Sequence, residues 1–184
     1  MEREEAFLLL QEKIKNENLI KHSLAVEAGM KALASFFKEN EKDWALAGLL
    51  HDIDYEETKN NFSLHSKMAV QFLEEKGVKK EICQVVLTHN EIHQILPESK
   101  MTKVLFCFDQ LTGLIVASVL VLRSKKIKDL TVENVLHRFK EKSFAKGAKR
   151  EIIKKCQEYL GLPLEKFIEI VLESMKKISD DLGL

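Results

Sequence analysis

The sequence predicts an all-α protein built as a single-domain helical bundle. Apolar residues recur with a period near 3.6 along most of the 184 residues, and alternating polar-apolar runs are almost absent. Two prolines, Pro97 and Pro163, and seven glycines are the only strong breaks in this pattern. Long amphipathic segments with few breaks between them are typical of helices that pack on one another. About nine helices can be placed in this way.

Length and composition support one folded domain. The chain has 45% hydrophobic and 32% charged residues, which is ordinary for a globular protein and unlike a disordered one. We therefore expect a single domain over residues 1–184. Its core is expected over about residues 19–123, and a helical extension of different character over about residues 124–184.

Five helices are expected in the first half, over about residues 2–15, 19–37, 43–53, 63–77 and 79–90. The second carries His22 on its inner stripe, and the third ends at the pair His51-Asp52. Ser63 is a suitable N-cap for the fourth helix and would place His65 in its first turn. The fifth helix carries His89 near its C-terminus.

Four further helices are expected over about residues 102–123, 132–140, 148–160 and 163–179. A loop that contains Pro97 precedes the first of them, and a basic loop follows it. Gly161 and Pro163 mark the last boundary, as a glycine after one helix and a proline at the start of the next. The long helix over residues 102–123 is apolar nearly all round, except for Asp109 and its neighbours.

One series of polar residues stands out against this apolar pattern. It consists of four of the six histidines and two aspartates: His22, His51, Asp52, His65, His89 and Asp109. Imidazole nitrogen and carboxylate oxygen are ligands that Zn, Mn and Fe accept. A buried, unpaired carboxylate on an apolar helix is strongly disfavoured, so Asp109 needs a cation nearby or neutralisation. The residues therefore suggest a two-metal hydrolytic site.

Each member of the series also has an ordinary interpretation. A lone histidine such as His22 is usually a core residue with one hydrogen bond, and a histidine at a helix C-terminus suits the helix dipole. His65 and His89 could be exposed polar residues. These readings must all hold at once across five predicted helices, whereas one metal centre explains the whole series. His93 is an alternative to His89 as a ligand, and His137 is interpreted as structural.

The order His22, His51-Asp52 and Asp109 resembles the H…HD…D pattern of the HD superfamily of metal-dependent phosphohydrolases. Two histidines between the HD pair and the last aspartate, as His65 and His89 are, resemble its two-metal subset. The run from His51 to Asp54 is similar to the HDIG variant, with Asp54 in place of glycine. The strings HDIDYEET, LTHNE, DQLTGLIVA and KSFAKGAKREIIKK resemble a bacterial and archaeal group of stand-alone HDIG-type proteins.

This resemblance implies an HD-type helical bundle with two divalent ions (Fe, Mn, Mg or Zn) between its central helices. It implies that His22, His51, Asp52 and Asp109 hold one ion, and that Asp52, His65 and His89 hold the other. The implied activity is hydrolysis of a small phosphorylated molecule, a nucleotide being favoured, by a metal-activated water. Asp52 and Asp54 are the predicted catalytic residues. Asp54 would orient water or donate a proton, with a solvent-facing helix cap as its alternative role.

The substrate phosphate also needs a binding group. Candidates come from the basic loop over residues 123–129 and the basic cluster over residues 140–150, although such charge runs are usually a solvated face. The residues we single out are Arg123, Lys125, Lys142 and Arg150. Lys142 or Arg150 would fold back over the site.

Two other functions are compatible with the same ligands. One is a di-iron oxygenase of the HD superfamily, and the other is a non-catalytic metal-binding or nucleotide-binding domain. The equal numbers of basic and acidic residues, 29 each, argue against a dedicated nucleic-acid binder. Asp109 argues against a membrane span in the apolar run over residues 104–122. Three widely spaced cysteines and a charged N-terminus suggest a reducing, cytoplasmic location.

Overall fold

The computed structural model describes residues 1–184, and every regular element in it is helical. The elements are α1 (Arg3–Lys13), α2 (Glu17–Phe37), α3 (Glu41–Leu50), α4 (Tyr55–Thr58), α5 (Lys67–Glu75), α6 (Lys80–His89), η1 (Glu91–His93), α7 (Lys100–Leu120), η2 (Ile127–Asp129), α8 (Val132–Lys140), α9 (Arg150–Leu160), α10 (Leu164–Lys176) and α11 (Ser179–Leu182). The predicted all-α class is therefore confirmed. Each of the nine expected helices is present, and the structure adds the four-residue helices α4 and α11.

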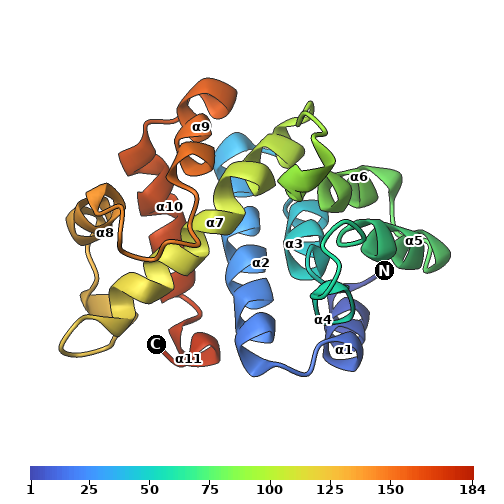
Figure 1. Cartoon of the computed structure of the whole chain (residues 1–184), viewed down its shortest axis with the longest axis horizontal. Helices are drawn as coiled ribbons and strands as arrows, with labels where there is room; N and C mark the ends of the chain where they lie inside the picture. The colour runs from blue at the N-terminus through green and yellow to red at the C-terminus, as the bar shows by residue number, and fades with distance from the viewer.

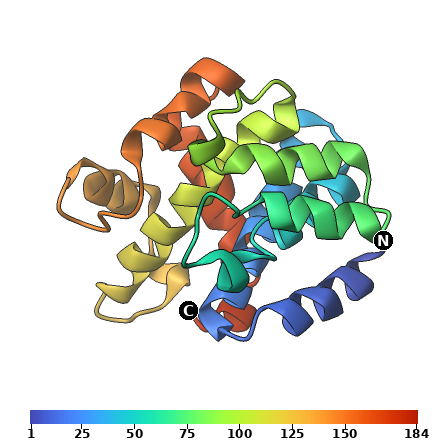
Figure 2. The same ribbon diagram turned by 45° about the vertical axis from the view of Figure 1, so that its right-hand side comes forward.

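The two longest helices, α2 and α7, form the middle of the bundle (Figure 1). Helices α3 and α6 pack on one side of them, with α1 against α3 and α5 against α6. Helices α8, α9 and α10 pack on the other side, and α11 returns to α2. Figure 2 shows the same order from a second direction, with α1 and α8 at opposite edges of the molecule. One cluster of 43 buried apolar residues joins both sides, so the bundle has a single hydrophobic core.

Close helix contacts depend on two glycines. A Cβ atom at Gly29 of α2 would lie 2.1 Å from the ring of Phe108 on α7, and one at Gly48 of α3 would lie 2.8 Å from the carbonyl oxygen of Val26. Only glycine leaves room for these contacts. They hold α3 and α7 tightly against α2, which is the helix that carries His22.

The start of α5 differs from the prediction. The helix begins at Lys67, and Ser63 lies in a turn rather than at the N-cap, so His65 precedes the helix instead of lying in its first turn. Ser66 has a positive φ of 71°, which interrupts any helix that would start earlier. The amide of Ala69 in the first turn donates instead to Asp54, which lies 15 residues earlier in the chain.

Two further expectations concern exposed and buried segments. His137, interpreted as structural, lies at the surface, where its side chain is 73% exposed and pairs with Glu141 at the end of α8. Helix α7 is long and apolar enough to cross a membrane by length and composition, but more than half of its apolar window is buried inside the protein. It contacts α2, α6, α8 and α9, so its apolarity is that of a core helix, as predicted.

Candidate metal centre

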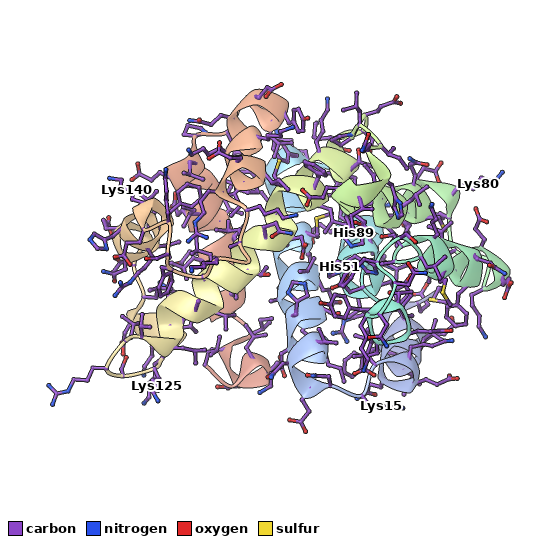
Figure 3. All side chains as sticks on the ribbon, in the orientation of Figure 1. Lys15, His51, Lys80, His89, Lys125 and Lys140 are labelled. Carbon is purple, nitrogen blue, oxygen red and sulfur yellow. The ribbon has the colours of Figure 1, made fainter.

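The six predicted ligands converge from five segments of the bundle. His22 comes from α2, His51 and Asp52 follow α3, His65 precedes α5, His89 ends α6 and Asp109 lies in the middle of α7. Figure 3 labels His51 and His89 near the centre of the molecule, and their ring centroids are 5.1 Å apart. Residues that are up to 87 positions apart in the sequence therefore form one cluster.

The first half of the cluster surrounds His22. Its Nε2 atom lies 3.0 Å from Oδ1 of Asp109, 3.2 Å from Nε2 of His51 and 3.7 Å from Oδ2 of Asp52. Nε2 of His51 lies 3.4 Å from the same Asp52 oxygen and 3.5 Å from Oδ1 of Asp109. Two imidazole nitrogens and two carboxylate oxygens thus face a common point.

The second half of the cluster uses the other oxygen of Asp52. Oδ1 of Asp52 lies 3.2 Å from Nε2 of His89 and 3.3 Å from Nε2 of His65. The carboxylate therefore has one oxygen in each half, and it is the only residue that the two groups share.

The opposite ring nitrogen of each histidine has a hydrogen-bond acceptor. Nδ1 of His51 donates to the carbonyl of Gly48 at 2.8 Å, and Nδ1 of His89 donates to that of Val86 at 2.6 Å. Nδ1 of His65 donates to Asp54 at 2.7 Å. In the neutral ring these bonds keep the proton on Nδ1, which leaves the Nε2 lone pair directed into the cluster.

His22 reaches the same arrangement through Thr112. The hydroxyl of Thr112 donates to the backbone carbonyl of Asp109 at 2.8 Å, so its oxygen accepts from Nδ1 of His22 at 3.1 Å. Thr112 therefore fixes the tautomer of His22 and ties it to the turn of α7 that carries Asp109.

Burial and charge together make the cluster attract positive charge. His51 is completely buried, and burial lowers its pKa, but the charge of Asp52 and the hydrogen bonds to Asp109 and Asp52 outweigh burial and raise that pKa well above 6.5. Burial also lowers the pKa of His65, while hydrogen bonds to Asp52 and Asp54 raise it to about 9. Burial raises the pKa values of Asp52 and Asp109, yet the facing histidines hold both well below the usual range.

The donor set fits divalent metal ions. With metal–ligand bonds of about 2.1 Å, neighbouring ligand atoms lie about 3.0–3.4 Å apart in octahedral or tetrahedral geometry. Most of the observed separations, between 3.0 and 3.5 Å, fall in or near this range. Two groups could hold an ion, namely His22, His51 and Asp52, and Asp52, His65 and His89. Four nitrogen and two carboxylate donors suit Zn, Mn and Fe.

A family model for the HD domain matches residues 19–114, which contain all six of these residues. The chain belongs to the HD domain family. Members of this family are generally metal-dependent hydrolases, which agrees with a His/Asp cluster able to hold metal. No curated protein and no solved structure matched the chain.

Asp54 of the HD domain has a different place from the one predicted. It is 5% exposed, so it is not a solvent-facing cap. Oδ1 accepts from Nδ1 of His65 at 2.7 Å and Oδ2 accepts from the amide of Ala69 at 2.9 Å. Because both oxygens are engaged away from the cluster, the predicted role in orienting water is corrected to one of positioning His65.

None of the four predicted phosphate-binding residues lines the cluster. Arg123 and Lys125 are exposed and lie beyond the C-terminal end of α7. About 16 Å of helix separates that end from Asp109. Figure 3 labels Lys125 at the edge of the molecule, away from His51 and His89. Arg150 donates to the carbonyl oxygens of Ala145 and Ala148 at 2.6 and 2.7 Å.

Arg150 therefore organises the loop over residues 141–149, and it also contacts the carbonyl of Phe144. Its guanidinium is committed to main-chain acceptors and is not available to a phosphate. Lys142, the fourth candidate, is exposed and lines neither hollow above the HD-domain cluster. The expectation that Lys142 or Arg150 folds over the site is therefore wrong.

Two hollows open above the cluster and share Asp52, Tyr55, Asp109 and Gln110. One, of about 360 Å³, contains His22 and is bounded by Ala145, Gly147 and Ala148 of the loop before α9. The other, of about 280 Å³, contains His65 and His89 and is bounded by Phe62, Asn90, Glu91, Ile92, Phe106, Lys149 and Ile152. Together they form one cleft, which we call the cluster cleft.

Several residues of the cluster cleft were not predicted from the sequence. Tyr55, Gln110 and Glu91 each lie next to or near a ligand in the sequence, but no periodicity indicates which way they point. Lys149 belongs to the predicted basic cluster, although it was not among the residues singled out. His93, the alternative to His89, donates from Nε2 to the carbonyl of His65 at 2.7 Å. It therefore contacts the backbone of a candidate ligand.

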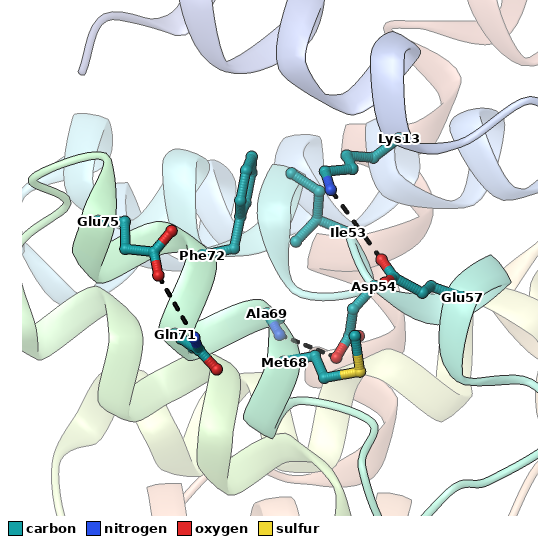
Figure 4. Close-up of a pocket in the computed structure, with 9 residues that line it drawn as sticks. All are labelled: Lys13, Ile53, Asp54, Glu57, Met68, Ala69, Gln71, Phe72 and Glu75. Carbon is teal, nitrogen blue, oxygen red and sulfur yellow. Dashed lines mark hydrogen bonds and ion pairs between the residues drawn. The ribbon is translucent and has the colours of Figure 1, made fainter.

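A separate pocket lies on the far side of Asp54 (Figure 4). It is bounded by α1, α4 and α5, with an ion pair between Lys13 and Glu57 across it, and Figure 4 shows the bond from the Ala69 amide to Asp54. Its walls hold none of the six clustered residues. The cluster cleft is therefore the candidate site of this HD domain.

Proposed function

We propose that this HD domain protein is a phosphohydrolase that uses two divalent ions and acts on a small phosphorylated molecule. A nucleotide is the favoured substrate. In this proposal one ion is held by His22, His51, Asp52 and Asp109, and the other by Asp52, His65 and His89. Placement in the stand-alone HDIG-type group stays a prediction, and so does a cytoplasmic location.

The observation that carries the proposal is the position of Asp52. Its Oδ2 atom lies 3.4 Å from His51 and its Oδ1 atom 3.2 Å from His89, so its two oxygens face two separate groups of donors. A carboxylate placed in this way can bridge two ions. At a site for one ion, His65 and His89 would instead be left to contact the substrate.

The protein would contribute positioning and a shaped cleft. Bound divalent ions supply polarisation of a phosphoryl oxygen and a lower pKa for water. The chain holds the four imidazole rings in fixed tautomers through their Nδ1 bonds, so little reorganisation is needed on binding. The cleft places a phosphate beside Asp52 and Asp109 only when their charges are balanced by cations.

A substrate with a flat group suits the second hollow. Tyr55, Phe62 and Phe106 are among the residues that line it. The rings of Tyr55 and Phe62 pack edge to face, with centroids 5.6 Å apart. Aromatic side chains of this kind provide surfaces for a nucleobase or a similar ring. This supports a nucleotide over an inorganic or sugar phosphate.

The proposal is tested by metal content and phosphate release together. Protein purified without chelator should hold about two ions per chain by mass spectrometry. It should release product from a phosphomonoester, a phosphodiester or a nucleoside monophosphate in a metal-dependent way. His89→Gln should lower both ion content and rate, whereas His137→Gln, a change at the exposed histidine on α8, should alter neither.

Two results would contradict this function. Protein that takes up no ion, even after reconstitution with Mn²⁺ or Zn²⁺, would exclude the two-metal centre. Iron-loaded protein that consumes O₂ but releases no phosphate would favour the oxygenase chemistry that the same donors allow.

A further inference from the structure

The cluster cleft contains one cationic side chain besides its histidines. Three carboxylates line it, those of Asp52, Asp109 and Glu91, and the only lysine or arginine is Lys149. Lys149 lies outside the residues matched by the family model, so it is a feature of the C-terminal part of this chain. Its role cannot be taken from the HD domain itself.

Lys149 is tied to the metal-binding helix through its backbone. It is the N-cap residue of α9, and its amide donates to the side-chain oxygen of Gln110 at 3.4 Å. Gln110 directly follows Asp109 and donates to the outer oxygen of that carboxylate at 3.4 Å. The backbone of Lys149 is thus two hydrogen bonds from a candidate ligand.

The side chain of Lys149 extends across the cleft and forms an ion pair with Glu91. Glu91 begins η1, two residues after His89. Its neighbour Asn90 fixes this segment by donating to the carbonyl of His65 at 3.1 Å. Both ends of the ion pair are therefore attached to segments that carry candidate ligands, one on each side of the opening.

The ion pair is accessible and easily exchanged. The side chains of Lys149 and Glu91 are 54% and 37% exposed, and ion pairs at such exposure are weak because water screens them. A phosphate group carries more negative charge than the carboxylate of Glu91 and offers more acceptor oxygens. It would repel Glu91 and attract Lys149.

We propose that Lys149 binds the phosphate group of the substrate, and that Glu91 holds Lys149 across the cluster cleft until phosphate displaces it. The inference rests on the proposed function. It adds Lys149 as a substrate-binding residue and Glu91 as a carboxylate that competes with phosphate for it. Two divalent ions would carry four positive charges against the two negative charges of Asp52 and Asp109. Glu91 then opposes phosphate binding, and Lys149 supports it.

The test measures binding of inorganic phosphate to the full chain loaded with Mn²⁺, by isothermal titration calorimetry, with ion content determined for every variant. Lys149→Gln should weaken phosphate binding about ten-fold or more, because a charge-assisted hydrogen bond is lost. Lys149→Arg should bind phosphate with an affinity within a few-fold of that of the wild-type protein. Glu91→Gln should tighten binding, and the double variant should behave like Lys149→Gln.

Lys146→Gln is the matched control, because Lys146 is exposed on the same loop and lines neither hollow. Unchanged phosphate binding in Lys149→Gln would overturn the inference and leave the proposed function standing. Weaker binding in Glu91→Gln would also overturn it, because the ion pair would then be structural. Loss of ions in Lys149→Gln would overturn it by showing that Lys149 acts on the metal centre. If the unchanged, fully loaded protein binds no phosphate, the proposed function fails together with it.

Discussion

Oδ1 of Asp54 lies 2.7 Å from Nδ1 of His65, and the other oxygen of Asp54 accepts a hydrogen bond from the amide of Ala69. One buried carboxylate therefore orients a candidate ligand and also satisfies the first turn of α5. A carboxylate behind a metal-binding histidine fixes its tautomer and makes its outer nitrogen a better donor. Asp54 links the start of α5 to the candidate metal centre.

Replacing Asp54 should weaken the second half of the centre. Asp54→Asn removes the negative charge behind His65, so metal affinity should fall about 10-fold to 100-fold, as is usual for such partners. Competition with a chelator of known affinity measures the change. Asp129→Asn, at the exposed aspartate that ends η2, serves as the control and should have no effect. Unchanged affinity in Asp54→Asn would show that His65 does not bind metal.

The two halves of the centre should lose metal separately. His89→Ala removes a donor from one half only, so ion content should fall from about two per chain to about one. Asp52→Ala removes an oxygen from both halves, so it should lower ion content further and reduce the stabilisation that metal gives the fold. Mass spectrometry of native protein counts the ions directly. Equal ion content in the two variants would contradict the bridging position of Asp52.

Stability of the metal-free protein should depend on pH in a defined direction. The folded-state pKa of His65, about 9, is raised above the unfolded value near 6.5, since its bonds to Asp52 and Asp54 outweigh burial. Its contribution is complete below about pH 6.5 and is lost as pH rises through 9. Asp52 and Asp109 have lowered pKa values, so their contribution is present above about pH 4 and is lost at lower pH.

Urea unfolding of chelator-treated protein at pH 6.5 and pH 10 measures the basic limb of this profile. The free energy of unfolding should be lower at pH 10, and His65→Gln should reduce the difference between the two values. Added metal should also reduce it, because metal replaces the protons on the histidines. A metal-free protein that is equally stable at both values would contradict the charged state assigned to the cluster.

The contact between Gly29 and Phe108 should control the distance between α2 and α7. A methyl group at position 29 would lie 2.1 Å from the Phe108 ring, so Gly29→Ala must separate the helices that carry His22 and Asp109. Overpacking of this kind costs about 1–3 kcal/mol of stability and should also lower metal affinity. Phe108→Leu in the same protein should partly restore both.

Gly113→Ala is the control for this substitution. Gly113 lies in α7, the helix of Phe108, and a Cβ atom there would meet nothing within 4 Å. The change should leave stability unchanged or raise it by up to about 1 kcal/mol, since alanine favours a helix. Thermal unfolding with and without metal distinguishes the two glycines. A Gly29→Ala protein as stable as the Gly113→Ala protein would show that the helices are free to separate.

The helices and the six clustered residues could be predicted from the sequence, because the signals for them lie within short segments of the chain. A 3.6-residue period identifies each helix, and a carboxylate such as Asp109 on an apolar helix requires a charge partner wherever the helix lies. The position of Asp54 depends on Ala69, 15 residues away, and the start of α5 depends on the same bond. Lys149 and Arg150 are neighbours of the same charge, yet one lines the cleft and the other is committed to carbonyl oxygens. No pattern in the sequence separates them.

Arg150 provides the last prediction, because its two possible roles respond differently to lysine. Its guanidinium holds the loop over residues 141–149 by donating to the carbonyl oxygens of Phe144, Ala145 and Ala148. Arg150→Ala should leave those acceptors without a partner and so lower the unfolding temperature. It should also raise KM, because Ala145 and Ala148 line the cluster cleft. Ion content should stay the same, because no candidate ligand contacts Arg150.

Arg150→Lys separates the structural role from direct phosphate binding. Lysine keeps the charge but lacks the planar fork that reaches several carbonyl oxygens at once. If Arg150 organises the loop, the lysine variant should resemble the alanine variant in both unfolding temperature and KM. If Arg150 instead bound phosphate, lysine would retain most of the affinity, and KM would stay near that of the unchanged protein while the unfolding temperature hardly moved. Measuring both quantities on both variants therefore decides between a loop that is held by Arg150 and a phosphate that is held by it.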